Sequence, residues 1–246
     1  MKKLLVFILL LIIVFLSGCT ELRRAKVLLP HSWVGMQKVS SHLYVEKSMS
    51  DANQTKIKIA IPKAKAYVRD IYGEVTTQPI IYACQSKECA ESLGLEGKVI
   101  AVRLLGHMIL TNRALNKEVI SHEWSHEELY ERIGGFYHWY KEIPLWFDEG
   151  VASLTMHTYS RYDHIAWNKI IKEKLTYPKK EELVTLAQWN KANHIYLNND
   201  EIVVPYATAR QIITKWYANV GKDGLVNLLQ GIKDGKHFDE LYGEEQ

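Results

Sequence analysis

The sequence predicts an α+β protein, with a small mixed β-sheet in its N-terminal part and only helices in its C-terminal part. Two apolar runs rich in β-branched residues, QPIIYAC at 78–84 and GKVIAVRLLGHMILTN at 97–112, are typical of strands. Gly106 interrupts the second run, so that run holds one or two strands. From Ala114 onward the apolar residues follow a helical spacing, which continues to the C-terminus.

The remaining elements can be placed by their local signals. A strand is expected at 41–49, and a short helix before Gly94. A mixed helix is expected at 51–73, although Pro62 leaves its first half open. Asn116 is a candidate N-cap for a long helix that ends at Gly134-Gly135. Further helices are expected to start near Pro144 and to cover 165–175, 181–190, 205–219, 223–230 and 236–242.

The N-terminus has the pattern of a secretory signal. Two lysines follow Met1, and an unbroken apolar run covers 4–16, which is shorter than the roughly 20 residues that span a bilayer. The run ends in LSGC at 16–19, which resembles the lipobox of bacterial lipoproteins. The resemblance implies a signal peptide at 1–18, cleavage before Cys19, and attached diacylglycerol and palmitate. The alternative is an uncleaved anchor with an incidental cysteine.

The rest of the chain is then expected to be an envelope protein held by its lipid. We expect an anchor, tether and first strand at 19–55 and one domain at 56–246, which is ample for a core. The residue after Cys19 is Thr20, not the aspartate linked to inner-membrane retention, which favours the outer membrane of a Gram-negative cell, facing the periplasm or exterior. The formal charge of +3 includes Lys2 and Lys3. No basic cluster indicates a nucleic-acid partner.

Two further cysteines, Cys84 and Cys89, lie five residues apart. Disulfides persist in exported proteins, so a local bridge is favoured over free thiols. A second metal site is the weakest interpretation, because the spacing is not that of a Cys-x2-Cys knuckle and no second pair exists.

The sequence HEWSHEEL at 122–129 carries the strongest chemical signal. On a helix, His122 and His126 lie about 40° apart, so both imidazoles can reach one metal ion. Glu123 lies beside them and can accept a proton from water activated by the metal. This is the H-E-x-x-H pattern, which also occurs by chance on polar helix faces.

A third ligand strengthens the interpretation, because catalytic zinc takes three protein ligands and keeps one position open. The metzincin pattern fails, since Leu129 and Arg132 stand where its glycine and third histidine would be. The other known solution is a glutamate on the next helix. Glu149 lies 23 residues beyond His126, which leaves room for a turn, a loop and an antiparallel helix.

HEWSH at 122–126, followed by PLWFDEGVA at 144–152, resembles the gluzincin branch of the zincin metallopeptidases. It is most similar to compact peptidase-MA-like proteins of bacterial envelopes. The resemblance implies a zincin-like domain, in which a small sheet and an active-site helix precede a helical lobe. It also implies one zinc ion on His122, His126 and Glu149, with Glu123 as base and proton shuttle. Trp124 and Ser125 depart from the family, in which apolar residues are commoner between the histidines.

Weaker likenesses concern the substrate. GHMIL at 106–110 resembles the edge strand that pairs with an extended peptide, and the segment at 205–232 resembles the family's C-terminal helices. The second likeness makes Tyr206 the candidate phenol for oxyanion stabilisation. Tyr137, Tyr159 and Tyr196 are its rivals, and His138, in the expected loop, is a rival of Glu149. Asp148, Ser153 and Asp163 are candidates for orienting a ligand, and Arg161 for binding a substrate carboxylate. The alternative for Asp148 is an exposed acid at a helix start.

The sequence therefore predicts a membrane-anchored zinc metallopeptidase that acts on peptides or proteins. The alternative is a non-catalytic zincin-fold lipoprotein that binds or scaffolds. The substrate, the choice between internal and terminal cleavage, and the oligomeric state stay open.

Overall fold

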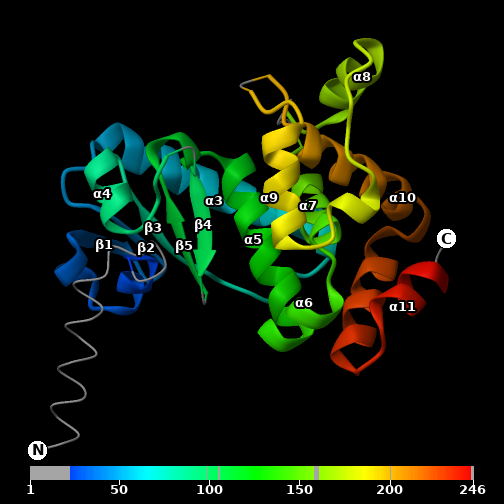
Figure 1. The fold of residues 1–246 in the computed structure, drawn as a ribbon. Helices are drawn as coiled ribbons and strands as arrows, with labels where there is room; N and C mark the ends of the chain where they lie inside the picture. The colour runs from blue at the N-terminus through cyan, green and yellow to red at the C-terminus, as the bar shows by residue number, and fades with distance from the viewer. Residues whose placement is uncertain (1–22, 98, 105, 158–160, 200, 245–246) are drawn as a thin grey trace, which may run out of the picture. The chain divides into compact units, whose positions relative to one another are not determined.

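The structure is a computed structural model, and it describes residues 23–97, 99–104, 106–157, 161–199 and 201–244 (Figure 1). The predicted signal at 1–18 and the predicted lipidation site Cys19 lie outside the described residues. The chain divides into two compact units. The first comprises the described residues of Met1–Ile57 and Gln78–Leu115, and the second those of Lys58–Thr77 and Asn116–Gln246. The predicted domain limits at 19–55 and 56–246 stay a prediction.

The first unit is built on a five-stranded mixed sheet in the described chain, so the α+β class is confirmed. The strands are β1 (Met36–Ser40), β2 (Leu43–Glu46), β3 (Ile80–Ala83), β4 (Ala101–Leu104) and β5 (His107–Leu110). Their order is β1-β2-β3-β5-β4. The pairs β2–β3 and β3–β5 are parallel, whereas β1–β2 and β4–β5 are antiparallel hairpins. The described part of this unit also contains the short 3-10 helices η1 (Ala25–Leu28), η2 (His31–Val34) and η3 (Asn112–Ala114), while η4 (Lys180–Glu182) belongs to the second unit.

The expectation that 106–110 forms an edge strand is wrong. Gly106 has a φ of 76°, a conformation that suits glycine and turns the chain between β4 and β5. The resulting hairpin gives β5 a partner on one side, and β3 pairs with its other side. Both backbone edges of β5 are therefore used within the sheet, and β4 lies at the edge instead.

The core of the first unit lies where β3 meets α4 (Lys87–Ser92). Cys84, at the end of β3, forms a disulfide with Cys89 in α4, with Cα atoms 5.5 Å apart. Ser86 caps α4 by accepting a hydrogen bond from the backbone N–H of Cys89. Within the stretch expected to be a tether, Ala25–Leu28 forms η1 and Val27 is buried, so this part belongs to the folded unit.

Helix α3 (Asp51–Tyr72) runs through both units and continues past Pro62, so its first half is helical as well. Its buried residues Ile57, Ala64 and Val68 follow a helical period, while Ile59 is exposed. This stripe of buried side chains outweighs the alternation of KIKIAI, which taken alone is typical of a strand.

The second unit is helical. Besides the end of α3 it contains α5 (Lys117–Arg132), α6 (Phe136–Glu142), α7 (Leu145–Leu154), α8 (His164–Lys172), α9 (Leu186–Ile195), α10 (Val204–Lys233) and α11 (Phe238–Glu244). Helix α7 packs against α5, α9 and α10 (Figure 1). Gly221 interrupts α10 with non-helical angles, at the break expected between two helices. Among the described residues, we find no helix with the length and apolar character needed to cross a membrane.

Candidate metal centre

Helix α5 presents the two histidines of the H-E-x-x-H pattern. Its N-cap is Asn116, whose side chain accepts a hydrogen bond from the Val119 N–H at 3.0 Å, as predicted. Ile120 and Leu129 are fully buried and hold the helix in the second unit. This packing fixes the orientation of α5. The rings of His122 and His126 lie edge to face on the helix, with centroids 4.8 Å apart.

Helix α7 presents Glu149. The helix follows Pro144, and its first two free N–H groups, on Leu145 and Trp146, donate to the carbonyls of Val184 and Leu183 at 2.8 and 2.9 Å. These bonds satisfy donors that a helix start leaves unpaired. They also fix the position of α7, which packs on α5 and so turns Glu149 towards the histidines.

The donor atoms of the three residues converge on one point. His122 Nε2 and His126 Nε2 are 3.2 Å apart, and Glu149 Oε2 lies 3.3 Å from the first and 3.7 Å from the second. Zinc in tetrahedral coordination, with bonds of about 2.0–2.1 Å, holds its ligand atoms about 3.3–3.4 Å apart. The spacing therefore matches a shared ion, and the group could hold a metal.

Unsatisfied polar atoms support the same assignment. Glu149 Oε2 is buried and makes no hydrogen bond within the described chain. A buried carboxylate oxygen without a donor costs free energy, and a cation between it and the imidazoles would remove that cost. Two imidazoles and one carboxylate form a donor set found in catalytic zinc sites. The residues present thus fit a metal ion.

Asp148 orients one ligand, which resolves the choice that the sequence left open. Its side chain is buried, and Oδ1 lies 2.6 Å from His126 Nδ1. Oδ2 accepts a hydrogen bond from the indole N–H of Trp139 in α6 at 2.8 Å. Because Nδ1 is engaged by the carboxylate, Nε2 of His126 is left to face the metal site. Asp148 is therefore a positioning residue and not an exposed acid at a helix start.

The surrounding charges also set the protonation of His126. Burial by itself lowers the pKa of this imidazole, but the carboxylates of Asp148 and Glu149 outweigh burial and raise its pKa to about 9. A metal that binds Nε2 must displace the proton, so metal uptake weakens as the pH falls.

We expect Asp148→Asn to lower metal affinity by about 10–100-fold, because the amide cannot hold His126 by its charge. Trp139→Phe removes only the second hydrogen bond of Asp148 and should have a smaller effect. Competition with a chromogenic chelator measures both affinities. Unchanged affinity in Asp148→Asn would show that His126 needs no support from this carboxylate.

Gly150 sets the distance between α7 and α10. A Cβ at this position would lie 2.5 Å from Ile213 Cγ1 and 2.8 Å from the carbonyl oxygen of Ala209. The Ile213 side chain can rotate, but the Ala209 carbonyl belongs to the α10 backbone and cannot. The glycine thus lets α7 approach α10 closely, and it immediately follows Glu149, a candidate metal ligand.

Gly150→Ala should therefore push α7 away from α10. Overpacking of this kind typically costs about 1–3 kcal/mol of unfolding free energy. Urea unfolding measures that loss, and elemental analysis should reveal reduced metal retention, because Glu149 moves with the helix. Gly150→Ala by itself raises helix propensity by about 1 kcal/mol, so any loss of stability must come from the clash. Ala152→Gly, the reverse exchange at a buried position of the same helix, shows the size of the propensity effect with the opposite sign. An alanine variant as stable as the wild type would contradict the close approach.

The predicted base lies on the metal-facing helix. Glu123 is half-buried, and its negative charge acts on both His126 and Tyr206. The Glu123 carboxylate is therefore close enough to His126, a candidate metal ligand, and to Tyr206, the candidate phenol, to raise the pKa of both. The structure therefore gathers Glu123 with the three ligand residues in the second unit.

Tyr206 reaches the centre from the first turn of α10. Its ring centroid lies 6.0 Å from that of His122 and 4.9 Å from that of Trp189. Burial, with the charge of Glu149, raises the pKa of the phenol well above its usual value, so it stays protonated and can donate a hydrogen bond. Tyr162, which the sequence did not single out, stacks on Tyr206 at 4.7 Å.

The rival residues lie elsewhere or serve other roles. Tyr137 is 68% exposed on α6, Tyr196 follows α9 and hydrogen-bonds Glu182, and Tyr159 lies outside the described residues. His138 was expected in a loop, which is wrong: it lies in α6, and the candidate metal group does not include it. A seven-residue helix fits between the Gly134-Gly135 turn and Pro144.

The other polar candidates also take ordinary roles. Asp163 caps α8, because its Oδ1 accepts the N–H groups of Ile165 and Ala166. Arg161 donates to the backbone carbonyl of Asn199. Ser153 is fully buried, and its hydroxyl makes no hydrogen bond among the described residues. None of these three contacts a metal-ligating atom in a described interaction.

Trp124 and Ser125, which lie between Glu123 and His126, have a structural explanation. The indole N–H of Trp124 donates to the hydroxyl of Thr77 at 3.0 Å. The hydroxyl of Tyr72 lies 2.9 Å from Ser125 Oγ and also donates to the Ser125 carbonyl. Trp124 and Ser125 therefore attach α5 to the end of α3 and to the segment that follows it.

No protein-family model and no curated protein sequence matches the chain. The class of protein consequently has to be inferred from the geometry and chemistry of this site.

Proposed function

We propose that the protein is a zinc-dependent metallopeptidase of the gluzincin type, in which His122, His126 and Glu149 hold one zinc ion. The convergence of their donor atoms, 3.2–3.7 Å apart, carries the proposal. A zincin-like fold is part of the same proposal. It is supported by a ligand-bearing helix pair in which α7 packs against α5.

The choice of zinc over other metals rests on Glu123. Two histidines and a carboxylate also suit iron(II) in oxygenases. Glu123, however, follows the first histidine directly, and a carboxylate base at this position serves hydrolysis at a zinc site. This combination favours a hydrolytic metal over a redox metal.

The chemistry divides among the residues as follows. A zinc ion held by His122, His126 and Glu149 would supply a Lewis acid for a substrate carbonyl and would lower the pKa of water towards neutral pH. Glu123 accepts a proton from the attacking water and delivers it to the leaving amine. Tyr206 donates its phenolic hydrogen bond to the carbonyl oxygen as negative charge develops there. Asp148 keeps His126 aligned throughout.

We further propose that the enzyme acts in the bacterial cell envelope, tethered through lipid on Cys19. The LSGC sequence at 16–19 supports the tether. The Cys84–Cys89 disulfide supports an oxidising compartment, where such bonds persist. The substrate would be a peptide or protein of that compartment.

Metal content tests the proposal directly. We expect about one zinc per wild-type chain and loss of that zinc in His126→Ala, measured by elemental mass spectrometry. His194→Ala, which removes an exposed histidine on α9, is the matched control and should keep its metal. Circular dichroism verifies that each variant is folded. A folded, zinc-supplemented wild type without metal would overturn the proposal.

A further inference from the structure

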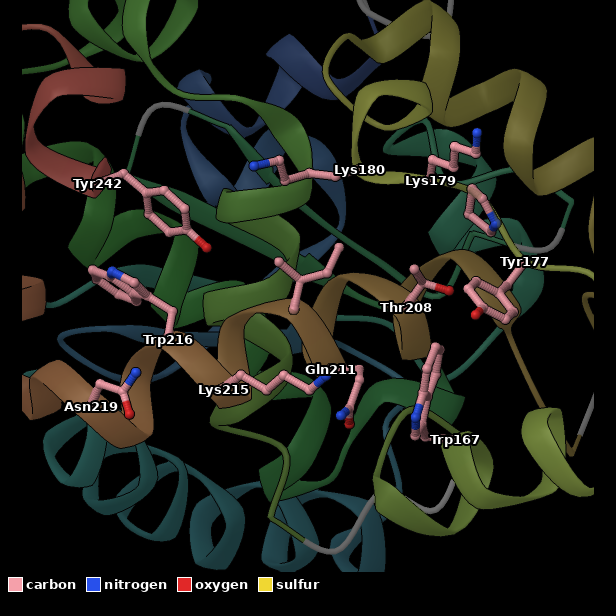
Figure 2. Close-up of a pocket in the computed structure, with 12 residues that line it drawn as sticks. Trp167, Tyr177, Lys179, Lys180, Thr208, Gln211, Lys215, Trp216, Asn219 and Tyr242 are labelled. Carbon is pink, nitrogen blue, oxygen red and sulfur yellow. The ribbon is translucent and has the colours of Figure 1, made fainter. Parts of the chain in front are cut away.

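A cavity of about 610 Å³ lies in the helical unit beside α10, lined by residues other than the candidate metal ligands (Figure 2). Small-molecule sites typically occupy about 300–1,000 Å³. In Figure 2, Lys180 and Lys215 lie on opposite sides of the cavity, with Trp216 and Tyr242 at one end and Trp167 at the other. The cavity thus combines aromatic walls with positive charge.

This cavity is separate from the metal centre because it uses a different face of α10. Its lining residues Thr208, Ile212 and Lys215 follow the i, i+4, i+7 spacing of one helix face. Tyr206, which approaches His122, precedes Thr208 by two residues and therefore points about 160° away around the helix. The cavity cannot be an extension of the metal site along that side chain.

The charge of the cavity indicates an anionic ligand. Lys179, Lys180 and Lys215 line it, and none of its described lining residues is an aspartate or glutamate. Among the described residues, no carboxylate forms an ion pair with these three lysines. Lys180 Nζ lies 5.3 Å from the Trp146 ring and 5.5 Å from the Tyr242 ring, which hold the side chain without neutralising it.

The arrangement of the rings argues against a flat aromatic ligand. Trp167 and Tyr177 meet at 64°, with centroids 5.1 Å apart. Trp216 and Tyr242 stack on each other at 5.4 Å. Neither pair leaves a slot between parallel rings for a base. A single ring face suits the apolar face of a sugar instead.

The polar groups of the cavity suit sugar hydroxyls. Gln211 and Asn219 carry side-chain amides, each of which both donates and accepts hydrogen bonds. Both line the cavity along α10, together with Lys215 (Figure 2). A hydroxyl-rich ring can use both functions of an amide, whereas a simple anion uses only the donor.

We propose that this cavity binds an anionic saccharide. The lysines take its carboxylate or phosphate, the ring of Trp167 packs on its apolar face, and the amides of Gln211 and Asn219 bind its hydroxyls. This site does not depend on the metal or on peptidase activity.

Titration calorimetry on the whole protein tests the proposal with matched ligands. We expect glucuronate and a glucose monophosphate to bind, and glucose, acetate and benzoate each to bind about tenfold more weakly or not at all. Glucose lacks the charge, acetate lacks the ring, and benzoate has a flat ring. The two charged sugars distinguish a carboxylate from a phosphate site, and binding of either supports the proposal.

Variants locate the binding. Lys215→Gln should weaken glucuronate about tenfold, and Trp167→Ala should weaken it comparably. Lys191→Gln, at an exposed position of α9, should have no effect. Three results would overturn the proposal: no binding of either charged sugar, benzoate binding as tight as glucuronate binding, or glucuronate binding unchanged in both Lys215→Gln and Trp167→Ala.

Discussion

Exchange of Glu123 for glutamine is expected to lower peptide hydrolysis by about 10²–10⁴-fold while the metal stays bound. Glutamine has nearly the same shape but cannot accept a proton from water. The three donor atoms lie on other residues, so metal content should match that of the wild type. Separation of these two effects would assign the base role to Glu123, which lies on the same helix as both histidines.

The measurement is the rate of cleavage of unfolded casein by zinc-loaded protein, followed by mass spectrometry. Glu127→Gln is the matched control, because it makes the same exchange on α5 immediately after His126. Equal activity of Glu123→Gln and the wild type would rule out Glu123 as the base. A zinc-loaded wild type that cleaves no peptide in a broad library would instead favour the non-catalytic zincin-fold alternative.

Elements with a local signal were predicted well. Helix α5 was recognisable because Asn116 caps it, its buried residues repeat with the helical period, and Gly134-Gly135 ends it. Helix α6 was missed because no residue of it is buried, so it shows no apolar stripe. It depends instead on a tertiary contact, the hydrogen bond from Trp139 to Asp148.

Sheet order could not be predicted, because strand pairing depends on contacts far apart in the sequence. The run at 97–112 revealed strands and a break at Gly106, but not that β3 would occupy the other side of β5. The prediction that 106–110 is an edge strand, which came from the resemblance, is therefore wrong, although the prediction of a strand there is confirmed.

The candidate site also contains residues with a local sequence signal and residues that depend on long-range packing. The closeness of His122 and His126 follows from their spacing of four residues on one helix, so it could be predicted from the local sequence. Glu149 required the resemblance, since only the packing of α7 on α5 brings it to the histidines. Asp148 stayed open in the sequence, because neighbouring helical residues point about 100° apart and either direction was compatible with a role. Tyr162 and Glu128 had no local pattern at all.

Glu128 is a buried carboxylate of α5 that accepts several hydrogen bonds. It is fully buried in α5, and it accepts hydrogen bonds from the backbone and hydroxyl groups of both Thr76 and Thr77 at 2.8–3.1 Å. Arg132 Nε donates to the same carboxylate at 2.8 Å. These bonds tie the segment after α3 to α5, two residues beyond His126.

Glu128→Ala is accordingly expected to lower the unfolding free energy by about 2–4 kcal/mol, because it removes the acceptor of the partly buried Arg132 and of four threonine donors and leaves a cavity at a fully buried side chain. Urea unfolding of the metal-free protein measures this loss without the added stabilisation of a bound ion. Glu131→Ala, at an exposed position of the same helix, is the control and should change stability by less than about 0.5 kcal/mol. Equal stabilities of the two variants would mean that water replaces the lost carboxylate, and that α5 keeps its position by apolar packing alone.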